Sequence, residues 1–392
     1  MKGKVVLLMV ILFNSLLDIR SEIPIRINIS GPDGRITVNI FCDDDNSLKY
    51  NVLFKSRFVI QPSSMGITVD GIRLGEGIQL GEPDRYAIDE TYAMRGIVHS
   101  TARNHCSGMI IPATHIGSKT IYQVDIRVYN DGIAFRYEIP GKGSRVVSAE
   151  NTSFVIPGKS EVWYHDFHMH YEGQHTLKLI SEIGEGEWGA PPITFRLPGK
   201  QGYASITESA KINYSGMGLQ ADGKNAFIVR LGHEQPVSYP YELRYSKDDI
   251  DKLARPAKIE DTIKTPWRVV MIAEDLNNLV NCDIVYNVAP QPDPSLFPQG
   301  FNEDWLKPGR AVWGYLTPEP RTLEGMKNLS RLAGELGFEY HIVEGHWARW
   351  TFEEQKELVD YSREQNVGIL LWKHARDLRD PEKASGIFQV LP

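Results

Sequence analysis

Three short apolar runs alternate with two helical patterns near the end of the chain, and this order constrains the fold more than any other feature of the sequence. The apolar runs are Ala311 to Leu316, Tyr340 to Val343 and Gly368 to Trp372. Strands that alternate with helices in this way form a parallel sheet with helices packed on it. We therefore predict an α/β unit over residues 310–392.

The two helical patterns carry both the periodicity and the end signals of amphipathic helices. In the first pattern the apolar residues recur at spacings of three and four, and Gly337 follows as a stop signal. These apolar residues are Leu323, Met326, Leu329, Leu332, Ala333 and Leu336. The second pattern opens with Thr351 and Glu354, which have the spacing of a capping box. Each pattern is therefore predicted to be a crossover helix between parallel strands.

Polar and aromatic residues gather directly after the carboxyl ends of the predicted strands. In parallel α/β folds this edge of the sheet carries the active site, because its loops vary while the opposite edge stabilises the fold. The candidate substrate-binding residues there are Trp313, Glu344, His346, Trp347, Lys373 and His374, with Tyr315 beside them. The structural alternative is that Glu344 and Lys373 only form an ion pair across neighbouring strand ends.

The chain before this unit is predicted to be a large antiparallel β-sandwich over residues 22–286. Alternating apolar and polar residues mark strands such as Arg35 to Phe41 and Gln123 to Tyr129, and turn sequences such as Asn130 to Gly132 separate them. Hardly any helical period occurs among these strands. Prolines and glycines then punctuate residues 287–309, which we predict to be a linker.

The first residues of the chain combine a basic start with an apolar run that is short for a bilayer span. This pattern predicts a signal peptide over residues 1–21 and a periplasmic or secreted mature protein. An uncleaved interfacial anchor is the alternative. Nothing later in the sequence resembles a transmembrane helix.

Charge and cysteine content exclude two classes of protein. The formal net charge is -7 and the basic residues are scattered, which argues against a nucleic-acid partner. The three cysteines, Cys42, Cys106 and Cys282, permit at most one intramolecular disulfide and lack metal-ligand spacing. The sequence therefore does not indicate a disulfide scaffold.

Four blocks of the sequence occur in an order that is shared with a known family. They are Arg127 to Pro140, Tyr203 to Leu219, Thr265 to Val288 and Trp305 to Trp347. The blocks resemble glycoside hydrolase family 97, which comprises bacterial exo-acting α-glycosidases such as α-glucosidases and α-galactosidases. The resemblance implies an N-terminal β-supersandwich followed by the first part of a catalytic (β/α)8 TIM barrel.

The same resemblance implies an α-glycoside or oligosaccharide substrate and a calcium ion. The family's sandwich contributes one acidic calcium ligand, and the matching position in this sequence is Glu208. Calcium takes about six to eight oxygen ligands, so one carboxylate cannot fill the site alone. At the strand ends, Trp313, Tyr315 and Trp347 can stack on a sugar ring while the polar candidates bind hydroxyl groups.

The length of the predicted barrel adds a further expectation. A complete barrel takes roughly 250 residues, whereas this chain offers residues 310–392. Glycoside hydrolysis needs a pair of carboxyl groups, and Glu344 is the only acidic residue at a predicted strand end. We therefore expect a truncated α-glycosidase that is inactive alone, with its catalytic carboxylates beyond Pro392 and none in the visible chain. The alternative is a non-catalytic remnant whose sandwich binds carbohydrate.

Overall fold

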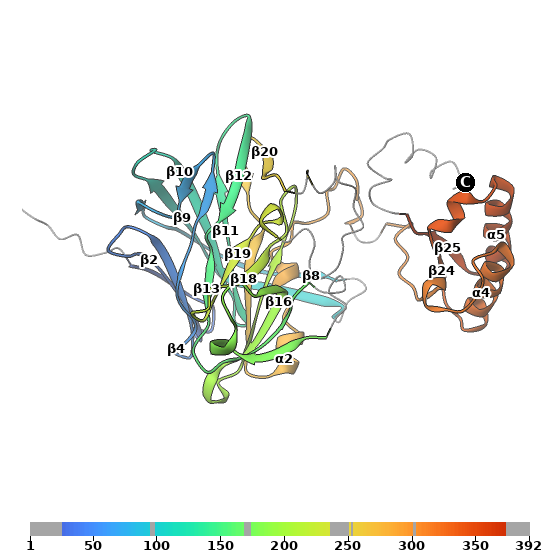
Figure 1. Ribbon diagram of the computed structural model, residues 1–392, viewed down its shortest axis with the longest axis horizontal. Helices are drawn as coiled ribbons and strands as arrows, with labels where there is room; N and C mark the ends of the chain where they lie inside the picture. The colour runs from blue at the N-terminus through green and yellow to red at the C-terminus, as the bar shows by residue number, and fades with distance from the viewer. Residues whose placement is uncertain are drawn as a thin grey trace, which may run out of the picture. The chain divides into compact units, whose positions relative to one another are not determined.

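The computed structural model describes residues 26–94, 99–167, 174–235, 251, 254–300 and 303–373. The chain divides into two compact units between Gln291 and Pro292, inside the segment that was predicted to be a linker. The N-terminal unit consists mostly of strands, whereas two longer helices dominate the C-terminal unit (Figure 1). The predicted signal peptide, residues 1–21, lies outside the described residues.

Antiparallel strands with alternating burial form the first layer of the N-terminal unit. Their order is β1-β2-β3-β4-β13-β19-β18. In β2, Ile36, Val38 and Ile40 are buried and the residues between them are partly exposed, as the sequence pattern predicted. The bounds are β1 (Arg26–Ser30), β2 (Ile36–Cys42), β3 (Leu48–Phe54), β4 (Arg57–Ser64), β13 (Ser153–Val155), β18 (Gly218–Ala221) and β19 (Ala226–Arg230).

The second layer is a longer antiparallel array in the order β8-β9-β10-β11-β22-β17-β16-β14-β15. Short β7 pairs with β9, and β21 pairs with β11. The bounds are β7 (Ile78–Leu80), β8 (Asp84–Ala93), β9 (Thr101–His115), β10 (Ile121–Val128), β11 (Gly132–Ile139), β14 (Glu161–His165), β15 (Thr176–Leu179), β16 (Trp188–Arg196), β17 (Tyr203–Ser209), β21 (Ile263–Lys264) and β22 (Trp267–Ala273).

Strand β16 joins the two layers. Its first residues, Trp188 and Gly189, pair with β18, and Ile193 to Arg196 pair with β17. A separate small sheet contains β5 (Ile67–Val69), β6 (Ile72–Leu74), β12 (Ser144–Glu150) and β20 (Ala257–Glu260). The predicted antiparallel β fold of this unit is therefore confirmed.

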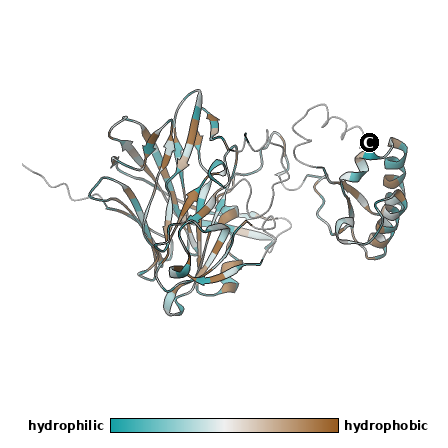
Figure 2. Cartoon of the chain, viewed as in Figure 1, coloured by the Kyte–Doolittle hydropathy of each residue, from teal (hydrophilic) through white to brown (hydrophobic). Residues whose placement is uncertain are grey.

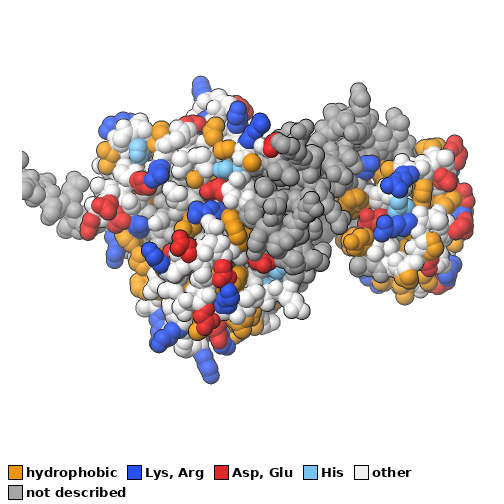
Figure 3. Space-filling model, in the orientation of Figure 1, with side chains coloured by type: hydrophobic (Ala, Val, Ile, Leu, Met, Phe, Trp, Pro, Cys, Tyr) orange, Lys and Arg blue, Asp and Glu red, His pale blue; other side chains and the backbone are white. Residues whose placement is uncertain are grey.

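The main hydrophobic core is built from the inward-facing residues of the strands, and brown and teal residues alternate along many of them in Figure 2. Tyr50 packs against Phe135 and Phe154, with ring centroids 5.1 and 6.5 Å away. Each buried side chain of this size stabilises the fold by about 1.5–3 kcal/mol. On the face seen in Figure 3, acidic and basic side chains are interspersed.

Two short helices, α2 (Leu276–Val280) and α3 (Ile284–Asn287), follow the last strand of this unit, where the sequence predicted hardly any helix. Asp275 caps α2 by accepting a hydrogen bond from the Asn278 N–H. Helices this short show no periodicity in a sequence. Ile284 packs in a second cluster with Tyr129 and Trp267. The three cysteines are free thiols.

The C-terminal unit contains three parallel strands in the order β23-β24-β25, as predicted. Their bounds are β23 (Ala311–Trp313), β24 (Tyr340–Val343) and β25 (Gly368–Leu371), and the crossover helices are α4 (Leu323–Glu335) and α5 (Phe352–Glu364). Thr322 caps α4, and the predicted capping box between Thr351 and Glu354 caps α5. Within the part of the chain that the structure describes, this sheet remains open.

Two details of this unit differ from the sequence prediction. The first strand ends at Trp313, and a 3-10 turn covers Gly314–Leu316, where a longer strand was predicted. Leu336 lies at the C-cap of α4 and is 62% exposed, because the helix has ended and Gly337 turns the chain with a left-handed φ of 67°. None of the helices in the described ranges is sufficiently long and apolar to cross a membrane.

Candidate functional site

Trp313 and Glu344 meet at the carboxyl edge of the parallel sheet. The indole N–H of Trp313 donates a hydrogen bond to Glu344 Oε1 at 2.6 Å. The Trp313 ring also stacks on Tyr315, with centroids 5.2 Å apart and an interplanar angle of 24°. Trp313 is 37% exposed and Tyr315 is 59% exposed. These three residues, which we call the aromatic edge, form an exposed ring surface beside a carboxylate.

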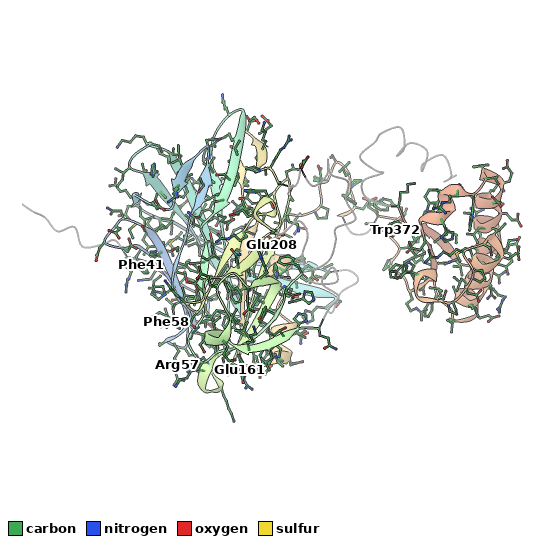
Figure 4. All side chains as sticks on the ribbon, in the orientation of Figure 1. Phe41, Arg57, Phe58, Glu161, Glu208 and Trp372 are labelled. Atoms are coloured by element: carbon green, nitrogen blue, oxygen red, sulfur yellow. The ribbon has the colours of Figure 1, made fainter. Side chains whose placement is uncertain are left out.

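Trp347 belongs to the interior of the same unit. Its side chain is only 4% exposed and packs with Met326 and Leu358, so little ring surface is left for a sugar. The Trp347 indole N–H donates to the carbonyl of Trp372, the residue that follows β25 and is marked in Figure 4. Lys373 Nζ lies 5.5 Å from the Trp347 ring centroid, a cation–π arrangement.

Two expectations concern the last part of the chain, after Lys373, which lies outside the described residues. His374 was predicted to bind substrate, and the catalytic carboxylates were expected beyond Pro392. Since the structure describes neither His374 nor Pro392, both expectations stay predictions.

His346 lies in the 3-10 turn Gly345–Arg349 that follows β24. Its two ring nitrogens are buried and have no hydrogen-bond partner in the described ranges, while its ring packs edge-on to Trp350 at 5.3 Å. Burial and then the positive charge of Arg321 lower the pKa of His346. The imidazole is therefore neutral at neutral pH.

A buried polar cluster behind the sheet was not anticipated from the sequence. His341 Nδ1 and Ser330 Oγ are 2.9 Å apart, and Ser330 Oγ is 2.7 Å from Ser362 Oγ, all at 0% exposure. Burial, reinforced by His346 when that ring is protonated, lowers the pKa of His341 to about 4. The one available signal was a histidine inside an apolar run, which does not reveal that Ser330 on one helix would bond it.

Glu208 in the N-terminal unit, marked in Figure 4, is part of a buried ionic triad with Arg268 and Glu150. Arg268 bonds both oxygens of Glu150, at 2.8 and 2.5 Å, and also bonds Glu208 Oε2 at 2.5 Å. Arg268 and Glu150 are fully buried, and the Glu208 side chain is 12% exposed. Glu208 Oε1 accepts a hydrogen bond from the Met217 N–H at 3.1 Å.

One known protein family has a model that matches most of the N-terminal unit. Residues 29–290 match the family model described as Glycosyl-hydrolase 97 N-terminal. The chain belongs to glycoside hydrolase family 97. The family 97 resemblance seen in the four sequence blocks is thereby confirmed, and the matched residues coincide with nearly all of the strands of the N-terminal unit.

Relatives of this family 97 chain include enzymes that act on α-galactosides. A "Retaining alpha-galactosidase" from Bacteroides thetaiotaomicron is 26% identical over 392 aligned positions, covering 88% of this chain and 55% of the relative. The chain spans about half the length of the curated relatives that it matches.

Two solved structures share the fold of the family 97 chain. A structure described as a beta-arabinopyranosidase has a TM-score of 0.79 at 18% identity and covers 93% of this chain and 60% of its own. A family 97 enzyme from Pseudoalteromonas sp. strain K8 in complex with acarbose has a TM-score of 0.72 at 19% identity, with coverages of 88% and 53%. At these identities the likeness shows the fold alone.

The predicted calcium site can be tested against the donor atoms around Glu208. The described ranges contain no group of three His, Cys, Asp or Glu side chains placed to hold a metal ion. Oε2 is bound to Arg268, and Oε1 has Lys211 Nζ at 3.8 Å, so two cations already neighbour this carboxylate. Since Ca²⁺ takes about six to eight oxygens, the described residues do not form a calcium site by themselves.

Proposed function

We propose that this family 97 chain serves in the hydrolysis of α-glycosides, with α-galactosides as the preferred class. The observation that carries the proposal is the alignment with the Bacteroides thetaiotaomicron α-galactosidase, which includes 88% of this chain. That extent means that the aligned region cannot be confined to one of the two units. The complex of the Pseudoalteromonas enzyme with acarbose adds support for an oligosaccharide ligand.

The aromatic edge would bind the sugar. The exposed rings of Trp313 and Tyr315 suit the apolar face of a pyranose, and the carboxylate of Glu344 accepts hydrogen bonds from sugar hydroxyl groups. Catalysis needs two carboxyl groups on either side of the glycosidic bond. Glu344 directly follows β24, and one carboxylate cannot supply both catalytic groups. We therefore assign Glu344 to sugar binding and assign no catalytic residue.

Binding of methyl α-galactoside to the full chain, measured by calorimetry, tests this proposal. We expect Glu344→Gln to weaken binding about tenfold, because a charged hydrogen bond contributes about 1.5–3 kcal/mol. Glu339 at the opposite end of β24 provides a matched control, since Glu339→Gln changes the same residue type outside the aromatic edge. An equal effect of the two substitutions, or a preference for methyl β-galactoside, would contradict the proposal. Hydrolysis of nitrophenyl α-galactoside is assayed in parallel.

Calcium binding is a second part of the proposed function. Glu208 Oε1 would be one ligand, and the others would come from outside the described residues. The test is a CaCl2 titration of the full chain with thermal melting as the readout, in which added calcium is expected to raise the Tm. An unchanged Tm at millimolar calcium would argue against the ion.

Export from the cytoplasm is the remaining part of the proposed function. We propose that residues 1–21 direct the chain to the periplasm or out of the cell. Cell fractionation with and without these residues tests this, and a cytoplasmic location of both forms would exclude it.

A further inference from the structure

A polar cavity of about 430 Å³ lies in the N-terminal unit. It is lined by Arg35 just before β2, by Phe54 at the end of β3, and by residues from β9, from the turn between β10 and β11, from the end of β22 and from the segment of α2 and α3. Its volume falls within the range of about 300–1,000 Å³ that small-molecule sites occupy. Segments that lie far apart in the sequence therefore converge on one cavity of ligand size.

Hydrogen bonds among residues at this cavity fix its walls. His99 bridges two lining residues, since Nδ1 is 3.1 Å from Asp283 Oδ1 and Nε2 is 3.1 Å from Asn281 Oδ1. Asn287, another lining residue, accepts from Tyr92 Oη at 2.8 Å and donates to the Arg103 carbonyl at 3.2 Å. A cavity whose polar walls are already held in place binds a ligand at a smaller entropic cost.

The charges of the lining favour an uncharged ligand. Arg35 and Arg103 are each paired with a carboxylate, Arg35 with Glu274 and Arg103 with Asp89, so neither is an open anion site. In the described ranges no side-chain group is arranged for a metal ion. Asp131 lines the same cavity, and burial raises the pKa of its carboxyl group.

Closely spaced carboxylate, amide and guanidinium groups complement a molecule that has both donors and acceptors on neighbouring atoms. Vicinal hydroxyl groups of a pyranose have this property. Phe54 and Tyr129 also line the cavity, but at 5% and 2% exposure they provide its floor and not a stacking surface. We propose that this cavity binds a single uncharged sugar ring through polar contacts, with Asp131 as an acceptor for its hydroxyl groups.

The test is calorimetric titration of the full chain with D-galactose, which does not require hydrolysis. We expect saturable binding that Asp131→Asn weakens at least tenfold and that the second variant Arg103→Gln also weakens. Asp84→Asn is the matched control, because Asp84 is exposed on β8 and does not line the cavity. Trp313→Ala reports on the aromatic edge and is expected to retain this binding event.

Each other outcome is decisive. Absence of saturable binding overturns the proposal, and so does equal binding by the Asp131 and Asp84 variants. Loss of all binding in Trp313→Ala would assign the sugar to the aromatic edge, which overturns the cavity and supports the proposed function. A melting curve of Asp131→Asn that matches the parent chain shows that any loss reflects the cavity and not unfolding.

Discussion

Two glutamates, one in each unit, show how differently the same side chain is held. Glu208 in the sandwich is 12% exposed and fixed by Arg268, which is itself bonded to Glu150 at 0% exposure. Glu344 at the aromatic edge is half-buried and accepts a hydrogen bond from the Trp313 indole. A buried carboxylate needs an opposite charge to offset desolvation, whereas one near solvent needs only a neutral donor.

The contrast between Glu208 and Glu344 indicates which of the two carboxylates is available to a ligand. In the ionic triad Glu208 Oε2 is already bonded to Arg268, so the first role of this residue is to stabilise the sandwich. The aromatic edge leaves exposed rings next to a carboxylate, which is the arrangement that we propose to bind a sugar. The following predictions are arranged to separate structural carboxylates and polar groups from those that bind.

Glu150→Gln should have the largest effect on stability. The substitution leaves Arg268 buried with Glu208 as its remaining charged partner, and breaking a buried pair costs about 3–5 kcal/mol. Urea unfolding of the full chain with probes for each unit measures this loss, which is expected in the N-terminal unit. The control is Glu161→Gln, which removes a half-exposed pair with Arg196 and should change stability much less. Similar losses in the two variants would show that the triad is no more structural than a surface pair.

Acidification should destabilise the C-terminal unit. The pKa of His341 is about 4 in the folded state, below its ordinary value of about 6.5, so the unfolded chain binds the proton first as pH falls. The stability that depends on neutral His341 is therefore complete above about pH 6.5 and lost progressively down to about pH 4, by on the order of 3 kcal/mol.

Tryptophan fluorescence during urea unfolding at several pH values measures this loss, because Trp347 and Trp350 belong to the core of that unit. His341→Gln should flatten the pH dependence. The control His115→Gln alters an exposed turn of the sandwich and should preserve it. A parent chain equally stable at pH 4.5 and pH 7 would refute the assignment to His341.

Substitutions of Trp313 should separate stacking from hydrogen bonding at the aromatic edge. Trp313→Ala removes both contributions and should weaken methyl α-galactoside binding about tenfold, whereas Trp313→Phe keeps a ring and should weaken it about threefold. Calorimetry measures both values. If the two variants bind equally, the ring surface contributes nothing and the indole N–H bond to Glu344 accounts for the whole effect.

The smallest effect is expected at the start of α5. Thr351→Ala removes the hydroxyl that accepts from the Glu354 N–H and should destabilise the C-terminal unit by about 1 kcal/mol. Thermal melting measures the change. Thr262→Ala, at an exposed position of the sandwich, is the control and should leave the melting of both units unaltered. If Thr351→Ala lowered the stability of the C-terminal unit more than acidification does, helix capping would contribute more to that stability than the buried cluster around His341.

Much of the fold could be read from local patterns. The strands near Ile36 and Val124 and the helices that begin after Thr322 and Thr351 appear where alternation, periodicity and capping signals predicted them. These patterns are local because side-chain direction repeats every two residues in a strand and every 3.6 in a helix. Helices α2 and α3 were missed because they are shorter than a detectable period.

The candidate site was predictable only in part. The sequence put Trp313 and Glu344 at the same edge of the sheet, and in the structure Trp313 ends β23 while Glu344 follows β24. The hydrogen bond between the two side chains was not predicted. The same rule placed Trp347 at the edge too, yet the turn Gly345–Arg349 directs its ring into the core. A turn of five residues is decided by packing and carries no periodic signal.

The sequence by itself determined the two kinds of unit, their order along the chain and the family 97 resemblance, because these depend on local periodicity and on short ordered motifs. Tertiary structure alone decided that Glu208 is bound by Arg268, that Ser330 links His341 to Ser362, and that Asp131 lines a cavity with α2 and α3. Those contacts join residues far apart in the chain. Burial and charge compensation select them, and neither quantity exists until the strands have paired.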